Sequence, residues 1–131
     1  MCELLTPADV EDALGHPVAT EVIATIDCRY TTVDARMFDA TEITVSIARP
    51  AWDTAESFVQ AIEASAEPGD TAERIHELGD AAVLLTTPDL TLLNVMTGDT
   101  VITLGVLRHR GPDSAGETLA SLARLALQRM P

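Results

Sequence analysis

The chain has 131 residues, of which 47% are hydrophobic and only 3% aromatic, so it can form one folded domain, residues 1–131, with an aliphatic core. Its formal net charge is −13, from 21 acidic and 8 basic residues, and a surface of this sign is repelled by nucleic acid and by anionic membranes. We therefore expect no nucleic-acid partner. No apolar run approaches the roughly 20 residues of a membrane-spanning helix, so we also expect no transmembrane segment.

The first predicted element is a short helix over residues 7–14. Thr6 is a suitable N-cap, Pro7 fits the first helical position, and Asp9 lies where the acid of a capping box belongs. Gly15 is a natural helix stop. These residues define both ends of the helix.

Two segments that follow show the alternation of apolar and polar residues that is typical of half-buried strands. In residues 17–32, every second position from Val22 to Tyr30 is apolar or aromatic. Residues 40–50 repeat the pattern, and Pro50 ends it. We expect one strand in each segment.

The clearest predicted helix covers residues 52–70. Asp53 is the expected N-cap, and Glu56 would complete a capping box. An apolar stripe recurs at helical spacing along the segment. Pro68 and Gly69 break the pattern and end the helix.

The second half of the chain is expected to form three strands and a closing amphipathic helix. Residues 71–79 are at most a short extended piece that leads to a turn at Gly79 and Asp80. Gly98 and Asp99 separate the last two strands at hairpin distance. The expected ranges of the three strands and the helix are 81–86, 90–96, 100–108 and 114–130.

The predicted order is therefore helix, two strands, helix, three strands, helix. Short connections between strands favour antiparallel pairing, and amphipathic helices need an apolar sheet face to pack against. We predict an α+β fold: an antiparallel sheet of about five strands flanked by three helices.

Four segments of the sequence together resemble a known family. They are CELLTPADVEDALG at the N-terminus, CRYTT, ELGDAAVL around the predicted turn, and VMTGDTVITLGV across the predicted hairpin. These segments are similar to the small extracytoplasmic lipoprotein domains of actinobacteria, which typically open with Cys-x-Leu-Leu-Thr-Pro and carry a second cysteine. The chain departs from that family at Glu77, where the family's Gly-Leu-Gly-Asp-Ala-Ala-like turn begins with a glycine.

The resemblance implies a disulfide between Cys2 and Cys28, a helix-flanked antiparallel sheet and a location in the cell envelope, outside the cytoplasm. It also implies a lipid anchor and a signal peptide upstream of Met1. A disulfide that closes a loop of roughly 25 residues adds about 3 kcal/mol on the chain-entropy model. Three other interpretations of the cysteines stay open: two free thiols in the cytosol, a lipidated Cys2, or a metal site.

The sequence contains no recognisable catalytic constellation. His16, His76 and His109 lie in or near predicted turns and far apart, and carboxylate pairs are expected by chance in so acidic a chain. A nucleophilic pair of Cys28 with a histidine is disfavoured, because a cysteine in an alternating strand faces the core or a disulfide. No phosphate-binding loop, Gly-x-Ser-x-Gly elbow or His-Glu-x-x-His helix is present. We expect no catalytic residue, no metal and no cofactor.

Three aromatic residues are candidates for a ligand-binding groove: Tyr30, Phe38 and Trp52. Trp52 precedes the second predicted helix, where an exposed ring could line a groove with one of the other two. The competing interpretation is a hydrophobic staple, in which Trp52 is buried against that helix.

The sequence favours a non-catalytic, lipoprotein-type domain of the cell envelope that binds a small hydrophobic ligand or an envelope protein. The alternative is a small cytosolic α+β protein with a ligand-binding or enzymatic role. Such a protein could form a dimer through its sheet. A third interpretation is an adaptor whose acidic surface meets an Arg- or Lys-rich partner. The oxidation state of the cysteines separates the first two.

Overall fold

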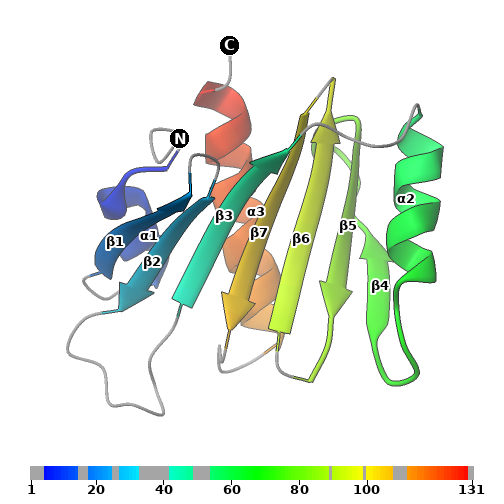
Figure 1. Ribbon diagram of the computed structural model, residues 1–131, viewed down its shortest axis with the longest axis horizontal. Helices are drawn as coiled ribbons and strands as arrows, with labels where there is room; N and C mark the ends of the chain where they lie inside the picture. Colours follow the sequence, from blue (N-terminus) through cyan, green and yellow to red (C-terminus); the bar gives the residue numbers. More distant parts are fainter. Residues whose placement is uncertain are drawn as a thin grey trace.

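The computed structural model shows one antiparallel sheet and three helices in the part of the chain that it describes (Figure 1). The predicted α+β class is confirmed. The described residues are 5–14, 18–24, 27–32, 42–48, 54–88, 90–98, 100–107 and 112–129. The elements in chain order are α1 (Pro7–Leu14), β1 (Val18–Ala24), β2 (Asp27–Thr32), β3 (Glu42–Ala48), α2 (Ala55–Ala64), β4 (Thr71–Arg74), β5 (Ala81–Thr86), β6 (Leu90–Thr97), β7 (Thr100–Leu107) and α3 (Pro112–Arg129).

The strand order β1-β2-β3-β7-β6-β5-β4 divides the sheet into two meanders. Strands β1 to β3 follow one another, and β4 to β7 return from the far edge, so that β7 pairs with β3 (Figure 1). All neighbouring strands are antiparallel. The two halves of the sheet therefore meet along a single seam, which runs from Glu42 opposite Leu107 to Ala48 opposite Val101.

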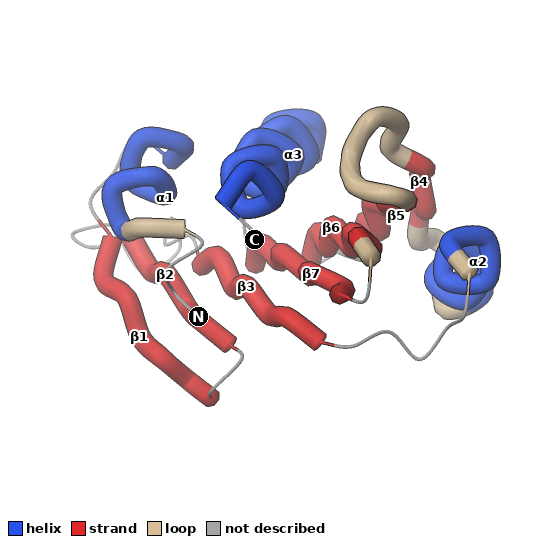
Figure 2. The backbone as a smooth tube through the Cα atoms, turned by 90° about the horizontal axis from the view of Figure 1, so that it is seen from above, coloured by secondary structure: helices blue, strands red, loops and turns tan. Residues whose placement is uncertain are grey.

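The helices cover opposite faces of the sheet. Figure 2 shows α1 and α3 on one face, and α2 at the β4–β5 end on the other. Alternate strand residues divide accordingly between two apolar clusters. The larger cluster, under α1 and α3, includes Leu5, Val10, Cys28, Tyr30, Ile43, Val45, Leu78, Leu93, Val95, Ile102, Leu104, Val106, Leu119 and Leu122. The smaller cluster, under α2, consists of Phe58, Val59, Val83, Met96 and Val101.

The sheet has seven strands rather than about five, for two reasons. The segment 17–32, expected to be one strand, is the hairpin of β1 and β2, which pair from Val18 opposite Thr32. Its alternation continues through the reversal, and Thr25-Ile26 contains no glycine, proline or asparagine that would indicate a turn. The second extra strand, β4, has four residues that are mostly exposed, so hydrophobic periodicity could not reveal it.

The predicted capping box of α1 is confirmed. The Thr6 N–H donates to Asp9 Oδ2 at 2.7 Å, and the Asp9 N–H donates to Thr6 Oγ1 at 3.2 Å. The same carboxylate binds Arg129 in the last turn of α3, where Nη2 lies 3.1 Å from Oδ1 and Nη1 donates to Oδ2. The bond from Arg129 holds the pKa of Asp9 well below its usual range, against the opposing effect of desolvation. Asp9 thus both caps α1 and ties it to α3.

The prediction of Asp53 as N-cap of α2 is wrong: the N-cap is Thr54. Thr54 has an extended backbone, with φ −130° and ψ 155°, and its Oγ1 accepts the Ser57 N–H at 3.0 Å. Asp53 lies outside the described residues. Aspartate and threonine are both good N-caps, so the sequence pattern was ambiguous by one position. Since the helix begins one residue later, Glu56 is not the capping acid and pairs with Arg74 instead.

Tyr30 attaches the residue that precedes α1 to the sheet. Its side chain is 0% exposed, and its hydroxyl donates to the Leu5 carbonyl oxygen at 2.6 Å in a buried position. Burial raises the pKa of the Tyr30 phenol, and the charge of Asp9 adds to the effect. The hydroxyl is therefore a proton donor at neutral pH, which is the state that this hydrogen bond requires.

We expect Tyr30→Phe to lower the free energy of unfolding by about 1 to 2 kcal/mol, because the variant keeps the ring but leaves the buried Leu5 carbonyl without its donor. Urea unfolding followed by circular dichroism measures this change. Thr103→Val is the control: it removes a half-buried bond to Asn94 of 3.2 Å, and its smaller loss sets the scale for a less buried hydrogen bond. An unfolding midpoint of Tyr30→Phe equal to that of the wild type would contradict the role of Tyr30.

The ion pair of Asp9 predicts a pH dependence of stability. The folded-state pKa of Asp9 lies below the value of about 3.9 in an unfolded chain. The pair therefore stabilises the fold at neutral pH. This contribution is lost as the pH falls below the unfolded-state pKa toward the folded-state pKa. We expect Asp9→Asn to be less stable than wild type at about pH 7, and the difference to shrink toward about pH 2. Asp12→Asn, on an exposed position of the same helix, is the control. A difference that stays constant with pH would show that the pair contributes nothing.

Candidate functional site

Two of the five predicted site residues lie in the described part of the chain. Cys28, on β2, is 1% exposed and disulfide-bonded, and the described residues contain no free cysteine. Tyr30 is on the same strand and belongs to the larger apolar cluster, so its ring contributes to the core and not to a groove. Cys2, Phe38 and Trp52 lie outside the described residues.

The described ranges contain no group of three or more His, Cys, Asp or Glu side chains that could hold a metal ion. His76 is exposed in the turn between β4 and β5, whereas His16 and His109 lie outside the described residues. In the same ranges, no helix combines the length and the hydropathy that crossing a bilayer requires.

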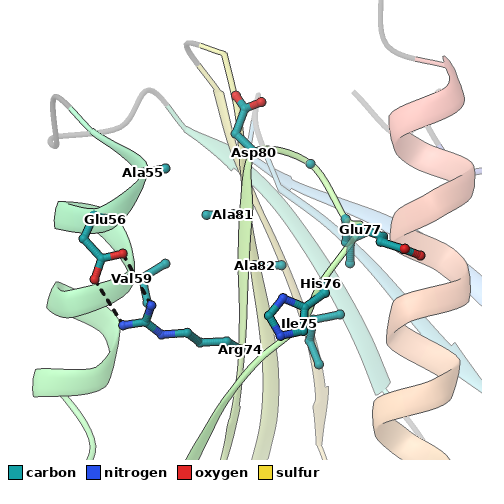
Figure 3. A pocket seen from close by; sticks show the side chains of 12 residues that line it. Ala55, Glu56, Val59, Arg74, Ile75, His76, Glu77, Asp80, Ala81 and Ala82 are labelled. Atoms are coloured by element: carbon teal, nitrogen blue, oxygen red, sulfur yellow. Dashed lines mark hydrogen bonds and ion pairs between the residues drawn. The ribbon is translucent and has the colours of Figure 1, made fainter.

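A pocket of about 240 Å³ lies between α2 and the turn that joins β4 to β5 (Figure 3). It forms because β4 ends at Arg74, opposite Val83, so that β5 extends past its neighbour at this end. The chain leaves the sheet there after one last bond, from the Ile75 N–H to the Ala82 carbonyl oxygen at 2.9 Å. Ala81 and Ala82, which have no partner on β4, line the pocket.

The turn over residues 75–80 is fixed from two sides. Leu78 is 2% exposed and packs in the larger apolar cluster. The Asp80 N–H donates to the Met96 carbonyl oxygen at 2.8 Å, and Asp80 Oδ2 accepts the Gly98 N–H at 2.7 Å. The prediction that Asp80 is a turn residue is therefore confirmed, and its carboxylate links this turn to the β6–β7 hairpin.

Two residues of this turn adopt the left-handed backbone region that favours glycine. Glu77 has φ 64° and Gly79 has φ 62°. A Cβ on Gly79 would lie 2.7 Å from both the Met96 carbonyl oxygen and Val95 Cγ1. Glu77 therefore holds a positive φ without the conformational freedom that glycine would have there.

Two charged residues of the pocket lining, Arg74 and Glu56, are paired with each other, and Arg74 also binds Glu63. Arg74 Nη2 lies 3.2 Å from Glu56 Oε1 and 2.9 Å from Glu63 Oε1. Hydrogen bonds to these carboxylates raise the pKa of Arg74, and the bond from Arg74 lowers the pKa of Glu63. Figure 3 shows Glu56 and Arg74 reaching toward each other, whereas Glu77 extends toward α3 and Asp80 points away from the pocket floor. The lining as a whole combines polar and aliphatic surface in about equal parts.

This arrangement is suited to binding. Val59 and Ile75 supply aliphatic surface, and the alanines of α2 and β5 leave space for an apolar group. The residues that line the pocket include no serine, threonine, cysteine or lysine, and their titratable side chains are those of Arg74, His76 and three acidic residues, Glu56, Glu77 and Asp80. No motif in the sequence marks this site. The two consecutive alanines at the start of β5 are the local feature that corresponds to it.

Comparison of the chain with protein-family models, with curated proteins and with solved structures gave no significant match. The class of the molecule, an antiparallel α+β domain with a small pocket beside α2, is therefore defined by its structure alone.

The two glycines with similar φ make a matched pair for testing the turn. Gly98 has φ 55° and nothing within 4 Å of a built Cβ. We expect Gly98→Ala to lower the free energy of unfolding by about 1 kcal/mol, because alanine is strained in the left-handed region. Gly79→Ala should lower it by about 3 kcal/mol, because overpacking against β6 adds to the same strain. Urea unfolding of both variants measures the difference. Equal losses would show that the close approach of the turn to β6 has no energetic weight.

Proposed function

We propose that the chain is a non-catalytic cell-envelope domain that binds a small hydrophobic ligand or an envelope protein. The observation that carries this proposal is the disulfide at buried Cys28. Disulfides persist in oxidising compartments and are rare in the cytosol, so a structural disulfide favours a location outside the cytoplasm. We take Cys2, the only other cysteine of the sequence, as its partner.

The resemblance to extracytoplasmic lipoprotein domains also supports the proposal, through the two cysteines and through the turn before β5. The family pattern calls for a glycine at Glu77, and the backbone there has the positive φ that glycine adopts most easily. By the same resemblance, a lipid anchor upstream of the chain is part of the proposal.

We place the binding site in the pocket beside α2, in place of the groove expected at Tyr30. The pocket volume of about 240 Å³ is below the roughly 300 to 1,000 Å³ of sites that enclose a whole drug-sized ligand. It suits an apolar group of a small ligand, or one side chain of a partner protein.

The location is tested by the intact mass of the full chain, alkylated in denaturant with and without prior reduction. We expect a mass two hydrogens below that of the dithiol, with alkylation only after reduction. We also expect Cys28→Ser to lose about 3 kcal/mol of stability, as the chain-entropy model gives for a loop of roughly 25 residues. Two labels without reduction would overturn the envelope proposal and favour the cytosolic alternative.

Binding is tested by titrating the isotope-labelled oxidised chain with hexanol and following backbone amide shifts. We expect shifts confined to residues 55–59 and 74–82, and their loss in Ala55→Leu, which fills the pocket. Ala64→Leu, an exposed position at the end of the same helix, is the matched control and should bind as wild type. Shifts that persist in Ala55→Leu would place the apolar site elsewhere.

A further inference from the structure

We infer that Tyr30 is a positioning residue for the oxidation of Cys28: its hydroxyl docks the N-terminal segment onto β2 before the disulfide forms. The inference rests on the pairing of Cys28 with Cys2 given in the proposed function. It assigns to the Tyr30 hydroxyl a role in how the chain reaches its oxidised state, in addition to its role in stability.

The first support is the register of the two residues on β2. Cys28 and Tyr30 are two residues apart on one strand, so their side chains lie on the same face of the sheet, and both belong to the larger apolar cluster. The Leu5 carbonyl oxygen accepts the Tyr30 hydroxyl at 2.6 Å. The residue that docks the N-terminal segment therefore lies on the same strand and the same sheet face as Cys28, and Leu5 belongs to the same apolar cluster.

The second support is the length of chain between the docking point and the other cysteine. Cys2 precedes Leu5 by three residues, and three fully extended residues span at most about 10 Å. Docking at Leu5 thus limits how far the Cys2 thiol can reach from the cluster that contains Leu5 and Cys28. Without docking, the two thiols are separated by a loop of 25 intervening residues, whose closure has an entropic cost.

The third support is that docking uses contacts that do not depend on the disulfide. Leu5 is 1% exposed in the larger apolar cluster. On the other side of it, Asp9 binds Arg129 and holds α1 on α3. Noncovalent contacts therefore hold both Leu5 and helix α1, which follows it, on the rest of the fold.

Docking of the N-terminal segment affects one of the two steps of thiol–disulfide exchange. One cysteine thiolate attacks glutathione disulfide, which forms a mixed disulfide and releases one glutathione. The second cysteine thiolate then attacks the protein sulfur of the mixed disulfide, which forms the internal S–S bond and releases the second glutathione. Two electrons pass from the cysteines to the oxidant, and the two thiol protons leave on deprotonation. Because Cys28 is 1% exposed, we expect the first exchange at Cys2, and only the second, intramolecular step depends on docking.

The test is the rate of disulfide formation in the reduced full chain under native conditions. Oxidised glutathione is added, samples are quenched with an alkylating agent, and intact mass resolves dithiol, mixed disulfide and internal disulfide. We expect the wild type to close without accumulating the mixed disulfide. We expect Tyr30→Phe to form the internal disulfide about fivefold more slowly, because losing one net hydrogen bond shifts the docking equilibrium by about that factor. The mixed disulfide should then accumulate.

Gly98→Ala is the control for a general loss of stability, because it lies in the β6–β7 hairpin and leaves the Leu5 contact intact. It should close at the wild-type rate, and in concentrated urea all three chains should close equally. Closure of Tyr30→Phe at the wild-type rate, or equal slowing by Gly98→Ala, would overturn the positioning role alone. A wild-type chain that never forms the internal disulfide would overturn the proposed pairing, and the inference with it.

Discussion

The pairing of β3 with β7 is the constraint on which the rest of the structure depends. Each meander alone is a small sheet with an uncovered apolar face, and the larger cluster is complete only when the two halves meet. Ile43 and Val45 on β3 face the same cluster as Leu104 and Val106 on β7, and α3 packs on β6 and β7 beside the seam. Such pairing between distant segments must overcome a loop-closure entropy that local hairpins do not face.

The crossover that this pairing demands explains where the pocket lies. The chain must pass from β3 to the far edge of the sheet, and α2 makes this connection on the face opposite α1 and α3 (Figure 2). The helix therefore rests on the end of the sheet, against β4 and β5. Because β4 stops at Arg74, a pocket remains between the helix and the following turn, where β5 contributes only Ala81 and Ala82.

The elements that the sequence predicts best are those whose signal is local. The capping box of Thr6 and Asp9 and the turn at Gly79 are both indicated by residues close together in the sequence, and both appear as expected. The hairpin within residues 17–32 was missed because the alternation of apolar residues continues on both sides of the reversal. Strand order, the position of α2 and the pocket depend on non-local pairing, which no local pattern records. The pocket in particular arises from the different lengths of two neighbouring strands.

The attachment of the N-terminal segment shows how a short element is held in a small, aliphatic and acidic domain. At eight residues, α1 is too short to be stable by itself in water. It is held by an ion pair at Asp9, by the hydrogen bond of Tyr30 to the residue ahead of it, and by the burial of Leu5 and Val10. These interactions respond to different conditions: acid weakens the first, and neither acid nor salt removes the apolar contacts. Neither acid nor salt alone therefore removes every contact that holds α1 on the rest of the fold.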